Sequence, residues 1–75
     1  MNQSSMRLFH LFRQHDVSGV SGIGVVAEGV ELTNGFVVMT WLTTHHSIVI
    51  YPNIKELEAI HGHEGSTKVV WLDNG

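Results

Sequence analysis

Apolar and β-branched residues are grouped in five short segments of the chain, separated by clusters of Gly, Asn, Pro, Ser and His. Runs of this length, bounded by turn-forming residues, are typical of strands. The first run, "RLFHLFR", is also compatible with a short helix, but its length and its aromatic residues favour a strand. The expected strands are 7–13, 25–32, 36–42, 47–51 and 67–72.

The dipeptide Asn34-Gly35 stands between the second and third expected strands. This pair favours a two-residue hairpin loop, since both central residues of a type I′ turn need positive φ. Such a loop pairs Val30 with Met39 and predicts a β-bulge at Glu28-Gly29. One face of the hairpin would then carry Val30, Leu32, Val37, Met39 and Trp41, and the other Glu31, Phe36, Val38 and Leu42.

Helix signals follow the fourth strand. Pro52 ends the strand, Asn53 is a suitable N-cap, and Glu56 lies three residues later, as in a capping box. The predicted helix covers 54–61, with Ile54, Leu57 and Ile60 near one face, and His61 in the last turn can meet exposed carbonyl groups. Gly62 follows, where a left-handed conformation commonly ends a helix.

This order of elements predicts an α+β fold. We expect a small curved five-stranded antiparallel sheet, or a partly open SH3-like barrel, with one short helix before the last strand. The chain of 75 residues is short enough for a single domain, 1–75, in which residues 1–6 form a disordered tail.

Composition excludes several classes of function. Four basic residues against seven acidic ones argue against nucleic-acid binding, which needs clustered Lys and Arg. The absence of Cys removes disulfides and thiolate zinc sites. The apolar run near the start of the sequence is too short for a signal peptide, and none of the apolar runs reaches the length of a membrane span, so we expect a cytoplasmic protein.

The stretches "DVSGVSGIGVVAEGVEL", "NGFVVMTWL" and "HGHEGSTKVVWLD" resemble a group of small bacterial proteins, some of them from actinobacteria and phages. The resemblance covers about residues 16–73, and its most specific part is the closing segment. It implies a compact domain and adds no role, no activity and no cofactor. A phage or mobile-element accessory protein is our expectation for an interaction module of this size, separate from the resemblance.

Histidine chemistry is the main candidate for a reactive site. His61, His63 and Glu64 could contribute to a divalent-metal site or a small metal-dependent hydrolase. His-x-His is a weak signature, however, and the segment is also explained as the end of a helix followed by a loop. "GVSGIG" precedes a strand and does not have the spacing of a dinucleotide-binding loop. We therefore expect no cofactor and no enzymatic activity. The six histidines also allow a pH-responsive surface.

Two-sided apolar strands with few charges favour a protein-interaction module. Trp41 and Trp71 are expected in the core, whereas Phe36 and Tyr51 are expected to be partly exposed. Exposed aromatic residues among few charges suit a protein contact. The predicted partner is another protein or a second copy in a homodimer. The candidate partner-binding residues are Val20, Ile23, Phe36, Val38, Leu42 and Tyr51.

Overall fold

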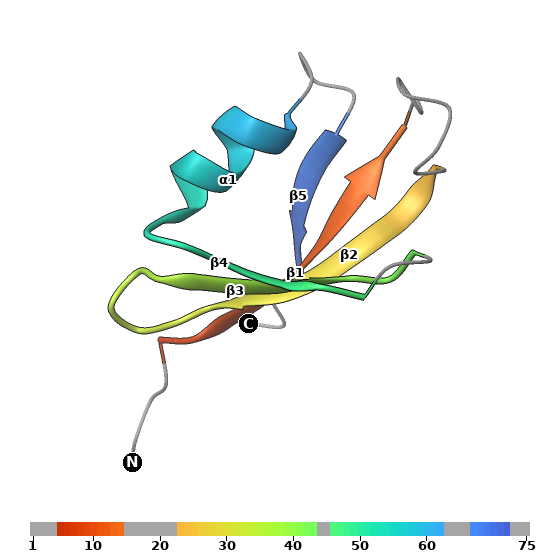
Figure 1. Ribbon diagram of the computed structural model, residues 1–75. Helices are drawn as coiled ribbons and strands as arrows, with labels where there is room; N and C mark the ends of the chain where they lie inside the picture. The colour runs from red at the N-terminus through yellow and green to blue at the C-terminus, as the bar shows by residue number, and fades with distance from the viewer. Residues whose placement is uncertain (1–4, 15–22, 44–45, 63–66, 73–75) are drawn as a thin grey trace.

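The computed structural model of the chain describes residues 5–14, 23–43, 46–62 and 67–72, and it has the expected α+β architecture (Figure 1). Five antiparallel strands form one sheet in the order β4-β3-β2-β1-β5, which does not close on itself. The elements are β1 (Arg7–Arg13), β2 (Gly24–Glu31), β3 (Val37–Trp41), β4 (Ile48–Tyr51), α1 (Ile54–His61) and β5 (Thr67–Trp71). The prediction of a five-stranded antiparallel sheet with a helix before the last strand is confirmed.

The β2–β3 hairpin differs from the prediction by one residue. The Gly35 amide donates to the Leu32 carbonyl (2.9 Å), and the Leu32 amide donates to the Phe36 carbonyl (2.7 Å). Gly35 has φ of 99°, and the Asn34 side-chain Oδ1 accepts a hydrogen bond from the Phe36 amide (3.2 Å). The loop therefore contains three residues, 33–35, because Thr33 joins Asn34 and Gly35 within it.

This longer loop changes which side chains share a face. Val30 pairs with Val38 rather than with Met39, and Gly29 pairs with Met39. The predicted grouping of Val30 with Val37 and Met39 is wrong, because a one-residue change of register moves a strand's side chains to the opposite face relative to its neighbour.

The β-bulge also lies elsewhere. Leu11 pairs with Ala27 and Phe12 pairs with Val25, so Val26 is the additional residue in β2. Pairing at Glu28 and Gly29, where the bulge was predicted, is regular with both neighbouring strands. The bulge allows Val26 and Ala27, which are adjacent in sequence, both to be buried.

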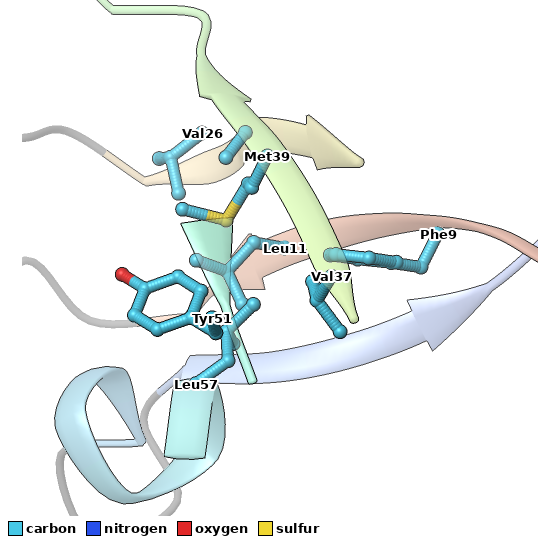
Figure 2. Close-up of a cluster of buried hydrophobic side chains, with 8 residues drawn as sticks. Phe9, Leu11, Val26, Val37, Met39, Tyr51 and Leu57 are labelled. Atoms are coloured by element: carbon cyan, nitrogen blue, oxygen red, sulfur yellow. The ribbon is translucent and has the colours of Figure 1, made fainter. Parts of the chain in front are cut away.

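The core lies between α1 and the inner face of the sheet (Figures 1 and 2). Trp41 and Trp71 pack against the core, as the sequence predicts. The ring of Trp71 meets the edge of Phe9, with 5.6 Å between centroids, and the Arg7 guanidinium lies 3.9 Å from the centre of the same indole. The buried hydrophobic residues are Phe9, Leu11, Val26, Ala27, Val37, Met39, Tyr51 and Leu57.

Helix α1 has the predicted bounds and the predicted N-cap. The Asn53 Oδ1 accepts a hydrogen bond from the Glu56 amide at 2.9 Å. The prediction for Gly62 is wrong: its φ and ψ of −66° and −31° are right-handed, and its amide donates to the Glu58 carbonyl at 2.8 Å. Helical hydrogen bonding thus continues through Gly62.

The inward face of α1 also differs from the prediction. Ile60, expected beside Ile54 and Leu57, is 55% exposed. His61 takes the inward position instead, because Ile54, Leu57 and His61 are spaced by three and then four residues and share one side of the helix.

Candidate functional site

The face of the sheet opposite α1, here called the outward face, carries a continuous line of aliphatic side chains. Leu8 pairs with Val30, Val30 with Val38, and Val38 with Ile50. The Leu72 amide donates to the Leu8 carbonyl at 2.8 Å, which extends the line to the end of β5. We call this line the apolar row; its members, from one edge of the sheet to the other, are Leu72, Leu8, Val30, Val38 and Ile50.

The ends of the apolar row are more exposed than its centre. Leu8 is 59% exposed and Ile50 is 65% exposed, whereas Val30 and Val38 are half-buried between neighbouring strands. Exposing a cluster of large aliphatic side chains to water has an unfavourable free energy. Exposed hydrophobic patches of this kind commonly mark interaction surfaces.

A second line of cross-strand neighbours runs beside the apolar row. Its central members, His10, Glu28 and Thr40, are polar, and its end members, Val70 and Ile48, are β-branched. We call it the mixed row. The outward face therefore combines an apolar strip with a narrow polar strip, which resembles the core and rim of a protein interface.

The two rows border a hollow of about 410 Å³. Its walls are mostly aliphatic, while Glu28 and Thr40 supply the polar atoms at one side. Ile50 is not among the residues that line the hollow, so its exposed side chain lies beside the depression rather than within it. The aliphatic lining residues on the outward face are Leu8, Val30, Val38, Ile48 and Leu72.

Three of the predicted partner-binding residues share β3 or its flanks. Phe36, Val38 and Leu42 alternate along the strand on the outward side; Phe36 and Leu42 are each 44% exposed, and Val38 is half-buried. Ile23 is also exposed, just before β2. Val20 lies outside the residues that the structure describes.

Tyr51 was predicted to be partly exposed, and the structure contradicts this. It is only 7% exposed, and its hydroxyl oxygen lies 2.6 Å from the Nε2 of His61. The reason is parity within β4: Tyr51 and Val49 point toward the core, and Ile48 and Ile50 point outward. Burial raises the pKa of the Tyr51 phenol, because the ionised form loses hydration.

The members of the outward face that sequence reasoning missed are mainly on β1, β4 and β5. A signal for them existed, since Leu8, Ile48, Ile50 and Leu72 alternate with residues now found in or against the core. The predicted hairpin register concealed Val30, because it assigned that residue to the buried face.

His61 belongs to an aromatic cluster. Its ring meets Trp41 and Tyr51 edge-on, with centroid distances of 5.1 and 5.8 Å. His63 and Glu64, the other predicted metal ligands, lie outside the described residues. Within the part of the chain that is described, no group of three or more His, Asp or Glu side chains could hold a metal ion. The metal and hydrolase hypothesis stays a prediction.

Comparison with known proteins identifies a family. No curated protein and no solved structure matches the chain. None of the helices in the described segments is both long and apolar enough to cross a membrane. A family model described as Acb5 phage protein matches residues 6–73, in agreement with the phage part of the sequence resemblance. Because this match covers nearly all of its 75 residues, the chain belongs to the Acb5 phage protein family.

Proposed function

We propose that the chain is a non-enzymatic phage accessory protein that acts in the host cytoplasm by binding protein through its outward face. The observation that carries the proposal is the apolar row, which crosses β4, β3, β2 and β1 and ends at Leu72, directly after β5, on the side of the sheet that α1 leaves uncovered. Membership of a phage protein family agrees with an accessory role.

Hydrophobic burial supplies the driving force for such a contact. Covering apolar surface contributes about 25 cal/mol per Å². Leu8, Ile48 and Ile50 each expose more than half of their surface, and Phe36 and Leu42 add partly exposed side chains at the two ends of β3. A partner that covers these residues removes water from them without disturbing the inner core.

The polar groups of the outward face are few and suit an interface. The Thr40 hydroxyl donates to the Ser47 carbonyl at 3.2 Å, so it is already hydrogen-bonded. His10 and Glu28 are neighbours across β1 and β2, and each retains polar atoms for a partner or for water. The aliphatic walls of the hollow favour hydrophobic docking over polar chemistry.

Site-specific photo-cross-linking in host cells tests the proposal. A photoreactive amino acid in place of Ile48, which is 70% exposed on the outward face, is expected to form a defined protein adduct, identified by mass spectrometry. The matched control places the same amino acid at Ile60, which is 55% exposed on α1. Adducts at Ile60 with none at Ile48 would contradict the proposal, as would the absence of adducts at both positions.

A further inference from the structure

We infer that the protein bound by the outward face is a second copy of this chain, related to the first by a two-fold axis. This inference rests on the proposed function and narrows it to one partner. It comes from three properties of the outward face: its shape, its charge and its area.

The shape provides both halves of a self-complementary contact. In an isologous two-fold interface the same patch meets itself, so a projection on one copy must meet a matching depression on the other. Ile50 at the β4 edge is 65% exposed, and the aliphatic hollow of about 410 Å³ lies beside it on the same face. Two copies placed face to face can each insert Ile50 into the other's hollow.

The charge of the outward face permits the approach of an identical copy. The whole chain has a formal net charge of −3, which would oppose association through an acidic surface. Among the described residues of the outward face, however, the strands contribute one carboxylate, Glu28, and one ammonium group, Lys68, together with His10. Glu56 and Glu58 lie on α1, away from this face. The surface is thus nearly neutral and can meet itself without strong repulsion.

The available area indicates a modest affinity. Strands lie about 4.8 Å apart, so the apolar row extends about 19 Å across the sheet, and the mixed row lies about 7 Å from it. With the side chains included, the outward face offers on the order of 500 Å² per copy. A standard stable interface covers about 800 Å² per partner, so we expect a reversible dimer with a dissociation constant in the micromolar range.

Sedimentation equilibrium over a concentration series tests the inference. The parent chain is expected to pass from 8.3 kDa to twice that mass as concentration rises through the micromolar range. Ile50→Glu is expected to weaken association at least about tenfold, because it places a carboxylate in an apolar hollow. Ile60→Glu, the same change at an exposed position on α1, should leave the dissociation constant unchanged. A parent chain that stays monomeric to millimolar concentration, or equal weakening by the two substitutions, would overturn the inference.

Disulfide trapping provides a readout that does not depend on Ile50→Glu folding normally. The natural chain contains no Cys, so a disulfide formed by a single introduced Cys must join two copies. Val38 lies between Ile50 and Val30 in the apolar row, close to the expected axis. Val38→Cys should give a covalent dimer on mild oxidation, and Lys55→Cys, exposed on α1, should give far less. Equal dimer yields from both variants would contradict this arrangement.

The failure of this inference can be told apart from the failure of the proposed function. A monomeric parent chain whose Ile48 position cross-links to a different protein would exclude the homodimer and leave protein binding by the outward face intact. A monomeric parent chain with no adduct at Ile48 would exclude both.

Discussion

Gly29 is the residue that allows β1, β2 and β3 to fit together around Phe9. A Cβ atom at this position would lie 2.5 Å from the Phe9 Cζ and 2.6 Å from the Val38 carbonyl oxygen. The first neighbour is a core side chain and the second is backbone, so neither can move easily. The position of Gly29 in the sequence predicts a bulge, whereas in the structure its missing side chain allows close packing.

The smallest possible addition at this position should therefore be costly. Gly29→Ala is expected to lower the free energy of unfolding by about 1–3 kcal/mol, because the methyl group overpacks the space against Phe9. Urea denaturation measures the change. Glu28→Ala, at the exposed neighbouring position, is the control and should change stability by no more than about 0.5 kcal/mol. A Gly29→Ala variant as stable as the parent chain would show that the strands can separate to accept it.

At the scale of elements, three side chains join α1 to the sheet, and Leu57 is the most deeply buried of them. Leu57 is fully buried, whereas the other residues of α1 are half-buried or exposed. Ile54 packs against the core from the first turn, and His61 contacts Trp41 and Tyr51 from the last. The position of Leu57 midway between them explains how a helix of only eight residues is held in place.

Truncation of two aliphatic residues on α1 should have very different effects. Leu57→Ala is expected to reduce the free energy of unfolding by about 2–5 kcal/mol, since it leaves a cavity between α1 and the sheet. Ile60→Ala, on the exposed side, should change it by no more than about 0.5 kcal/mol. Thermal or urea unfolding followed by circular dichroism distinguishes the two. Similar losses for both variants would mean that α1 packs differently.

At the scale of the whole molecule, the two faces of the sheet have separate roles. The sheet and α1 form two layers (Figure 1), and the core lies between them. The outward face retains exposed aliphatic side chains. Tyr51 is the last residue of β4, and its ring packs in the core between the sheet and α1. Its hydroxyl lies within hydrogen-bond distance of His61 on α1. Ionisation of this buried phenol would therefore disturb the contact between the two layers.

Stability should consequently fall at alkaline pH. The phenol titrates near pH 10.0 in the unfolded chain, and burial raises its pKa in the folded state. The contribution of Tyr51 to the free energy of unfolding is fully present below about pH 10 and is lost as the pH rises toward the folded-state pKa. In that range the unfolded chain binds fewer protons than the folded chain, so a rise in pH favours unfolding. Tyr51→Phe should show a smaller loss of unfolding free energy between about pH 9 and pH 11.

The single tyrosine of the chain makes this measurement specific, since all phenolate absorbance reports on Tyr51. Urea denaturation at each pH supplies the free energies, and the Lys and Arg contributions are common to both variants. Parallel pH profiles for the parent chain and Tyr51→Phe would contradict the prediction.

Part of the candidate site could be predicted because it depends on local alternation. Phe36, Val38 and Leu42 were identified from their positions on one strand, and all three lie on or beside the outward face. Ile48, Ile50, Leu8 and Leu72 were missed, because strand alternation alone does not show which of two apolar faces α1 covers.

Sequence alone determined the local elements of this protein. The bounds of α1, its Asn53 cap and the positions of the five strands follow from residues close together in the chain. Tertiary structure decided the hairpin register, the bulge at Val26 and the burial of Tyr51. These features depend on which distant side chains fill the core, and a difference of one residue in strand pairing exchanges the inner and outward faces.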